Sequence, residues 1–271
     1  MRRRIVKACV AALLAAAATG PSAASAAPSG PIHPGVQTFT SGGQCTANFI
    51  FRDAAGTYVG QAAHCAGTGS ATSTNGCSAT SLPINTPVTV TGASHPGTMV
   101  YSSWLTMQAR HETDPNTCAY NDLALVKLDR ADVASVDPTV PGFGGPTGVG
   151  GAAAAASVYS YGNSELRFGV SQLSPKQGLV LQVAGGGWSR TVYTVTPGIP
   201  GDSGSGFMNG AGQAIGVLST LALAPLALSN GVGDLAKELA YMRANSAFGG
   251  VQIVNGTRPF QSSLLSAILG G

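Results

Sequence analysis

Charged residues are scarce in this sequence of 271 residues, of which only 9% are Asp, Glu, Lys or Arg. Soluble proteins usually carry about 25%. The formal net charge of +3 excludes a strongly basic surface for nucleic acid. A long coiled coil would need more Glu, Lys and Arg, and the 44% of apolar residues excludes a disordered chain. Aromatic residues make up only 6%, whereas 38 residues are glycine. This composition indicates a weakly charged, glycine-rich globular protein.

The first 26 residues have the pattern of a secretory signal peptide. Basic residues at positions 2–4 and 7 precede an apolar run over 8–18, and Ala24-Ser25-Ala26 supplies small residues for cleavage after Ala26. A membrane anchor would need about 20 apolar residues, and this run is shorter. Without the signal peptide, ten basic residues face eleven acidic ones, so the exported chain is almost neutral. We expect a secreted, extracellular protein with no membrane contact after cleavage.

Only five cysteines are present, and Cys9 would leave with the signal peptide. The other four, Cys45, Cys65, Cys77 and Cys118, predict two disulfides in an exported chain, with three possible connectivities. A zinc site is the alternative, but it favours closely spaced ligands, and the sequence has no Cys-x₂-Cys pair. We therefore expect disulfides and no metal.

Short apolar or β-branched segments bounded by Gly, Pro, Asn or Ser dominate the rest of the chain. This pattern is typical of strands in an all-β barrel or sandwich. The strand candidates are 46–51, 58–62, 87–92, 98–104, 123–128, 179–184, 191–196 and 214–219.

Two other segments help to divide the chain. The Pro- and Gly-rich stretch 136–151 predicts a connection between two β units, followed by an alanine run (152–156) that fits either a helix or a strand. A helix is predicted from a cap at Asp234 to Arg243, because apolar residues recur there at helical spacing. The stretch 245–271 has no assignable role.

The loop Pro200-Gly201-Asp202-Ser203-Gly204-Ser205-Gly206 has the features of a nucleophile site. A serine hydroxyl needs a base to take its proton and donors to hold the developing oxyanion. Glycines beside the serine allow consecutive N–H groups to point to one spot. The N–H groups of Gly201 and Ser203 are suitably placed for this role. A polar hairpin loop is the alternative interpretation.

Two further segments supply a base and an acid. His64 ends the apolar segment Gln61-Ala62-Ala63-His64-Cys65, and Asp122 precedes the apolar segment 123–126. A partly buried carboxylate needs a partner, and an imidazolium can be one. The order His64, Asp122, Ser203 also argues against an α/β-hydrolase, in which the serine precedes the histidine. Ser205 lacks the Gly-Asp that precedes Ser203.

These segments resemble the signatures of the chymotrypsin-like serine proteases, Ala-Ala-His-Cys, Asp-Leu/Ile-Ala-Leu and Gly-Asp-Ser-Gly, in that order. The resemblance spans about residues 43–244, and the signal peptide and short N-terminus look like those of a secreted bacterial member. It implies an all-β fold of two six-stranded antiparallel barrels with the active site between them and a C-terminal helix. The implied divisions are a short N-terminal segment (27–42), a first barrel (43–140), a connection (141–151), a second barrel with the helix (152–244) and an extension (245–271).

The resemblance also implies residue roles. Ser203 would be the nucleophile, His64 the general base and Asp122 the carboxylate that orients it. The N–H groups of Gly201 and Ser203 would form the oxyanion hole. The family's disulfide beside the histidine corresponds to Cys45–Cys65, which gives Cys77–Cys118 as the second pair.

The sequence departs from the family pattern around the substrate pocket. Pro197 stands where trypsin-like members have an Asp for basic substrates, and Ser219, Thr220 and Leu221 match the strand that lines the pocket, with Leu221 at a position that is often Gly. We therefore expect small or apolar residues at P1, the substrate position before the cut bond.

The activation site of animal members is also missing, so Asp202 needs another partner. Arg167 and Arg190 are the candidates. The other acids after the 123–128 segment, Asp129, Asp132 and Asp137, are expected to be solvated. The histidines without a partner pattern, His33, His95 and His111, are expected in loops.

The sequence as a whole predicts a secreted serine endopeptidase that acts on polypeptides as a monomer, with no cofactor. Two alternatives remain open on the same fold. One is a binding protein with a blocked pocket and little turnover. The other is an esterase-like hydrolase that uses the same acyl-enzyme chemistry.

Overall fold

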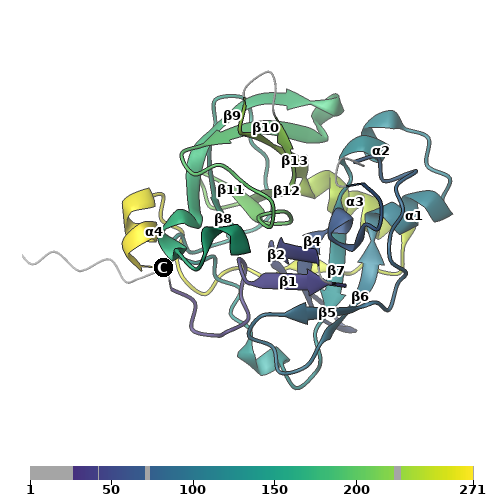
Figure 1. The fold of residues 1–271 in the computed structure, drawn as a ribbon, viewed down its shortest axis with the longest axis horizontal. Helices are drawn as coiled ribbons and strands as arrows, with labels where there is room; N and C mark the ends of the chain where they lie inside the picture. The colour runs from purple at the N-terminus through teal and green to yellow at the C-terminus, as the bar shows by residue number, and fades with distance from the viewer. Residues whose placement is uncertain (1–26, 42, 71–73, 223–226, 271) are drawn as a thin grey trace, which may run out of the picture.

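The computed structural model describes residues 27–41, 43–70, 74–222 and 227–270. The predicted signal peptide, residues 1–26, lies outside them. Strands are the main regular secondary structure of the described chain, and they form two β units that lie side by side (Figure 1). No described helix is long and apolar enough to cross a membrane.

The first unit is an eight-stranded sheet, and the last strand to join it comes from the far end of the chain. The strand order is β14-β3-β4-β7-β6-β5-β1-β2, and the described pairings are antiparallel. Its strands are β1 (Gln37–Thr40), β2 (Gly43–Thr46), β3 (Ile50–Asp53), β4 (Gly56–Ala62), β5 (Pro87–Val90), β6 (Gly97–Ser102), β7 (Leu123–Lys127) and β14 (Gln252–Ile253).

The second unit is a closed six-stranded barrel in the order β10-β13-β12-β11-β8-β9. Its strands are β8 (Ser157–Tyr161), β9 (Pro175–Ala184), β10 (Ser189–Thr194), β11 (Gly206–Asn209), β12 (Ala214–Ala222) and β13 (Ser229–Asp234). Every second residue of a strand points into the barrel. Val180 on β9 and Val192 on β10 are such residues; they lie opposite each other and are almost fully or fully buried. The predicted all-β fold class with two β units is confirmed, although the first unit has eight strands in an open order.

Four α-helices accompany the strands in the described part of the chain. They are α1 (Ser103–Ala109), α2 (Pro115–Tyr120), α3 (Leu235–Asn245) and α4 (Leu264–Gly270). The predicted C-terminal helix is α3, and Asp234 caps it by accepting a hydrogen bond from the N–H of Lys237 at 2.8 Å. The predicted strand 98–104 ends earlier, because Ser102 caps α1 and places Trp104 in a helix. The alanine run at 152–156 forms neither helix nor strand.

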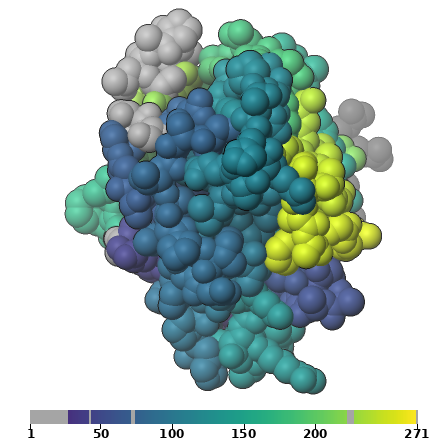
Figure 2. All heavy atoms as spheres, turned by 90° about the vertical axis from the view of Figure 1, so that its right-hand side faces the viewer, coloured from purple at the N-terminus to yellow at the C-terminus, as the bar shows by residue number. Residues whose placement is uncertain are grey.

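The stretch 245–271, for which the sequence suggested no role, runs along the connection between the two units. The N–H of Gly145 donates to the carbonyl of Arg258 at 3.0 Å, and the N–H of Gln261 donates to that of Phe143 at 2.7 Å. Phe260 packs edge-on against Tyr159 of the barrel with ring centroids 5.3 Å apart. In the space-filling view, C-terminal residues (yellow) lie against teal segments from the middle of the chain (Figure 2). We call residues 246–270 the strap.

Two acids that the sequence placed in solvent, Asp132 and Asp137, are buried and hold distant segments of the chain. Asp137 accepts hydrogen bonds from the N–H of Ser29 at 2.7 Å and from the hydroxyl of Thr257 in the strap at 2.9 Å. Asp132 accepts from the N–H of His95 at 2.9 Å and contacts its ring. The solvated interpretation is therefore wrong for both, because each carboxylate satisfies the backbone of a distant segment. Asp129 is exposed, as expected.

Candidate active site

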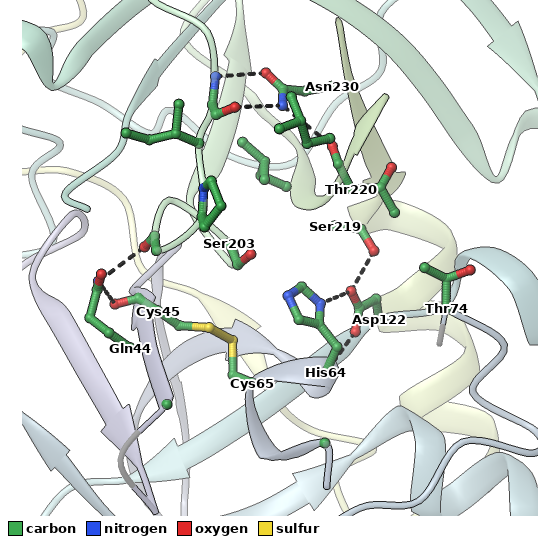
Figure 3. A pocket seen from close by; sticks show the side chains of 18 of the residues that line it. Gln44, Cys45, His64, Cys65, Thr74, Asp122, Ser203, Ser219, Thr220 and Asn230 are labelled. Atoms are coloured by element: carbon green, nitrogen blue, oxygen red, sulfur yellow. Dashed lines mark hydrogen bonds and ion pairs between the residues drawn. A yellow bond between two sulfur atoms is a disulfide. The ribbon is translucent and has the colours of Figure 1, made fainter. Parts of the chain in front are cut away.

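A cavity of about 670 Å³ opens between the two β units. This size suits a substrate side chain with adjacent main chain. The first unit and its loops contribute residues that include Gln44, Cys45, His64, Trp104 and Asp122, whereas the second contributes 198–201, Ser203, 218–221 and Asn230. Figure 3 shows these side chains converging from both sides.

Strand pairing brings His64 and Asp122 together. β4 and β7 are neighbours with Ala62 opposite Leu123, so the residues beyond this pair meet at the same edge of the sheet. His64 lies in a short 3₁₀ turn after β4. Its Nδ1 lies 2.6 Å from Oδ2 of Asp122, and its backbone N–H donates to Oδ1 at 2.9 Å. The carboxylate therefore holds both the ring and the backbone of His64.

The environment makes His64 a stronger base than a free histidine. Burial of the ring lowers its pKa, but the charge of Asp122 and their hydrogen bond outweigh burial and raise the pKa above its ordinary value. A quarter of the His64 side chain stays exposed, against 4% for Asp122. The hydroxyl of Ser219 also donates to Oδ2 of Asp122. Ser219, assigned from sequence to the substrate pocket, thus lines the cavity and contacts the acid as well.

The loop with Ser203 is shaped by the residue before it. The Asp202 carboxylate accepts hydrogen bonds from the N–H of Ile199 and of Ser164, both at 3.1 Å. Gly201 has φ +94°, and a Cβ there would lie 2.1 Å from Oε1 of Gln44, so the position requires glycine. This turn directs the Ser203 hydroxyl toward the His64 ring (Figure 3).

Two backbone donors of this loop are available to a ligand. Among the described residues, the N–H groups of Gly201 and Ser203 have no protein acceptor, whereas those of Asp202, Gly204 and Ser205 are bonded to the carbonyls of Ile199, Leu218 and Asp202. Both N–H groups are therefore available to an acceptor from outside the described chain.

Asp202 is fully buried and carries two cations. Arg167, one of the two partners that the sequence suggested for Asp202, contacts its Oδ2. The Nζ of Lys176 lies 2.9 Å from the same oxygen. The other candidate, Arg190, is not a partner of Asp202, because it pairs with Asp234 at 2.6 Å. Burial raises the pKa of Asp202, but Lys176 and Arg167 outweigh it and lower the pKa overall.

Lys176 is the member of this cluster that the sequence did not reveal. Its side chain is fully buried, and burial, opposed by Asp202, lowers its pKa to about 8. It lies on β9, on the face turned into the barrel. A lysine in a strand usually indicates solvent, so the sequence contained no signal for this residue.

Uncharged groups form the deep part of the cavity. Asn230, fully buried on β13, accepts from the N–H of Gly198 at 2.8 Å and donates to the carbonyl of Thr220 at 3.3 Å, so it joins the two walls. Thr220 and Leu221 line the cavity, as the sequence suggested. Pro197 lies just outside the lining, and its carbonyl accepts from Arg167 and Lys176. Asn230 was missed, because an isolated asparagine carries no positional signal.

Both pairings implied by the resemblance are present as disulfides, Cys45–Cys65 and Cys77–Cys118. The first fixes β2 to the turn that carries His64 (Figure 3). Ligand atoms of Cys45, His64 and Cys65 lie within 4.8 Å of one another, but both sulfurs are committed to the disulfide and are poor ligands for a metal.

Solved structures with the same fold are serine proteases. Thermobifida fusca protease A is 19% identical with a TM-score of 0.50, and the match covers 83% of this chain and 99% of that protein. A glutamic acid-specific serine protease that uses a histidine triad in substrate binding is also 19% identical with a TM-score of 0.50, covering 82% of this chain and all of that one. The fold is therefore the chymotrypsin-like serine protease fold. No protein-family model and no curated protein matches the sequence.

Proposed function

We propose that this protein is a secreted serine endopeptidase with His64, Asp122 and Ser203 as its catalytic triad. The supporting observation is that these three residues line one cavity, next to two backbone N–H groups without an internal acceptor. In the proposed division, residues 43–140 contribute His64 and Asp122, residues 152–244 contribute Ser203, and 141–151 connect the two.

The arrangement suits acyl transfer. The Ser203 hydroxyl attacks the carbonyl carbon of the substrate while His64 takes its proton through Nε2. Asp122 keeps the other ring nitrogen protonated and stabilises the imidazolium. The N–H groups of Gly201 and Ser203 hold the oxyanion, and each such donor contributes about 3 kcal/mol to transition-state stabilisation in related enzymes. His64 then protonates the leaving amine, and water hydrolyses the acyl-enzyme by the reverse sequence.

The proposed substrate is a polypeptide with a small or apolar P1 residue. The walls at 198–201, 218–221 and Asn230 carry no ionisable side chain, so a charged P1 group would lose its hydration without a counter-ion. Leu221 adds an apolar side chain to this lining. Secretion rests on the signal-peptide pattern of residues 1–26 and on the two disulfides. The protein is proposed to act as a monomer without a cofactor.

A fluorophosphonate probe tests the nucleophile. We expect covalent labelling at Ser203 in the secreted protein and its loss in Ser203→Ala. Ser205→Ala is the matched control, because Ser205 lies in the same loop but is fully buried. Absence of labelling in a folded wild-type protein would reject the enzyme and favour the binding protein. Cleavage of a peptide library then separates a peptidase from an esterase and reports the P1 residue.

A further inference from the structure

The carboxyl group of Glu238 lies in the protein interior next to Asp122, and the proposed chemistry does not use it. Glu238 belongs to α3 and is fully buried. Its Oε1 accepts a hydrogen bond from the backbone N–H of Asp122 at 2.9 Å. Within the described chain, Oε2 has no hydrogen-bond partner. A buried acid is therefore committed to the peptide of the residue that orients His64.

The neighbouring backbone leaves space for this acid. A Cβ at Gly233 would lie 2.7 Å from Oε1 of Glu238 and 2.9 Å from the carbonyl oxygen of Tyr120, so any larger residue would displace the contact. The next residue, Asp234, caps α3 and pairs with Arg190. These contacts fix the first turn of α3, which includes Glu238, four residues after Asp234 and on the same face of the helix.

Burial and the neighbouring acids favour the uncharged form of Glu238. Asp122 faces it from the start of β7, Asp234 from the end of β13 and Tyr101 from β6. Burial raises the pKa of Glu238 well above its ordinary value; the hydrogen bond from Asp122 opposes this, and the charges of Asp122 and Asp234 add to it. Burial, together with Glu238 and Tyr241, likewise raises the pKa of Tyr101.

We infer that Glu238 is a positioning residue of the triad, whose carboxyl group fixes the peptide of Asp122 and thereby aims the Asp122 carboxylate at His64. The inference rests on the proposed function. The Asp122 carboxylate is held by the His64 ring, the His64 N–H and the Ser219 hydroxyl. The backbone carbonyl of Asp122 accepts from the N–H of Ala63 at 2.9 Å. Glu238 supplies the only contact to its N–H among the described residues.

A neutral acid suits this position better than the alternatives. An apolar side chain would leave the buried N–H of Asp122 without an acceptor. An ionised carboxylate would repel the Asp122 charge that stabilises the His64 imidazolium. Glutamine is the one common residue of equal size that also accepts a hydrogen bond without charge, and it provides the conservative test.

The experiment compares Glu238→Gln and Glu238→Leu with Leu239→Ala, a buried neighbour on α3 that serves as the destabilising control. We expect Glu238→Gln to keep the wild-type kcat. Glu238→Leu should lower kcat by about 10- to 100-fold with little change in KM, because misplaced catalytic groups cost such factors. Leu239→Ala should lower the Tm and leave kcat unchanged. A folded Glu238→Leu with wild-type kcat would overturn the inference, as would an equal loss of kcat in Glu238→Gln or Leu239→Ala.

NMR of the His64 ring in the resting protein provides a readout that needs no turnover. We expect the Nδ1 proton signal and the raised His64 pKa to persist in Glu238→Gln, and the pKa to fall toward its ordinary value in Glu238→Leu. An unchanged titration in a folded Glu238→Leu would overturn the inference. If the wild type neither reacts with the fluorophosphonate nor cleaves peptides, the proposed function fails, while this titration still decides whether Glu238 aligns Asp122 with His64.

Discussion

Nδ1 of His64 lies 2.6 Å from Oδ2 of Asp122, and the N–H of the same histidine donates to Oδ1. An ionised carboxylate can only accept hydrogen bonds, so the ring nitrogen that faces it carries the proton. The opposite nitrogen, Nε2, is then the one that can accept a proton from Ser203. The carboxylate thus fixes both the position and the tautomer of the base.

Asp122→Asn should lower kcat by about 10⁴-fold, because an amide can present its NH₂ to the ring and stabilise the wrong tautomer. The fold should persist, since the amide fills the same volume. Steady-state kinetics on the best library peptide, with circular dichroism, measures both. Asp129→Asn changes an exposed acid outside the cavity and should retain full activity. Similar rates for the two variants would contradict the role of Asp122.

Activity should rise with pH through an apparent pKa above 6.5, because His64 acts as a base only when neutral and Asp122 raises its pKa. The raised pKa of His64 also affects the stability of the fold, which should decrease as pH rises. The raised pKa stabilises the fold fully below pH 6.5, and this contribution is lost as pH rises through the folded pKa. A pH profile of kcat/KM and a His64 titration by NMR measure the shift. A midpoint below 6.5 for both would refute it.

Asp202→Asn should destabilise the protein by about 3–5 kcal/mol, because Arg167 and Lys176 would remain buried without their counter-ion. Fluorophosphonate labelling should also fall, since Asp202 shapes the turn before Ser203. Urea unfolding gives the free energy. Asp53→Asn serves as a control, because Asp53 is only partly buried and lies in a surface hairpin. A loss no greater than that of the control would show that the cluster is not needed.

Lys176→Met should flatten the dependence of stability on alkaline pH. The Lys176 pKa is about 8 in the fold and 10.5 when free, so the unfolded chain binds more protons between these values. The Lys176 contribution therefore makes the free energy of unfolding increase with pH in this window. Arg167 still pairs with Asp202 in the variant, so it should fold. Urea unfolding at pH 7.5 and at pH 10 measures the slope, and an unchanged slope would contradict the assignment.

Phe260→Ala should destabilise the protein by about 2 kcal/mol, because the Phe260 ring is packed against Tyr159 of the barrel. Leu265→Ala, also in the strap but 67% exposed, should change stability by less than about 0.5 kcal/mol. Thermal unfolding of both variants tests whether the strap contributes to stability. Equal losses of stability in the two variants would mean that the packing of Phe260 does not contribute to stability.

The sequence predicted those parts of the fold where local pattern and environment agree. Short apolar segments with flanking turn residues located β4, β7 and β12, and the Asp234 cap located α3. β13 was not predicted, because its sequence Ser-Asn-Gly-Val-Gly-Asp is polar and glycine-rich and is a strand only through its two neighbours in the barrel. The sequence 46–51, which appeared continuous, is broken after Thr46 and resumes at Ile50.

The residues of the candidate site also fall into those that local sequence could predict and those that it could not. His64, Asp122 and Ser203 lie in characteristic local sequences, so the amino-acid sequence alone was enough to propose each of them. Lys176, Asn230 and Glu238 have no such sequence, because their roles arise from burial and from partners more than 20 residues away. Asp137 is similar, since its partners come from both ends of the described chain.

The pairing of β14 with β3 has a consequence for the order of folding. Gln252 pairs with Arg52, and Ile253 with Phe51, so an edge of the first sheet closes only when a strand 200 residues later in the chain arrives. Contacts between such distant residues slow folding, because the intervening chain must be ordered first. The first β unit therefore cannot complete its sheet until residues 252–253 have been synthesised. Until then, the unpaired edge of β3 is open to incorrect partners.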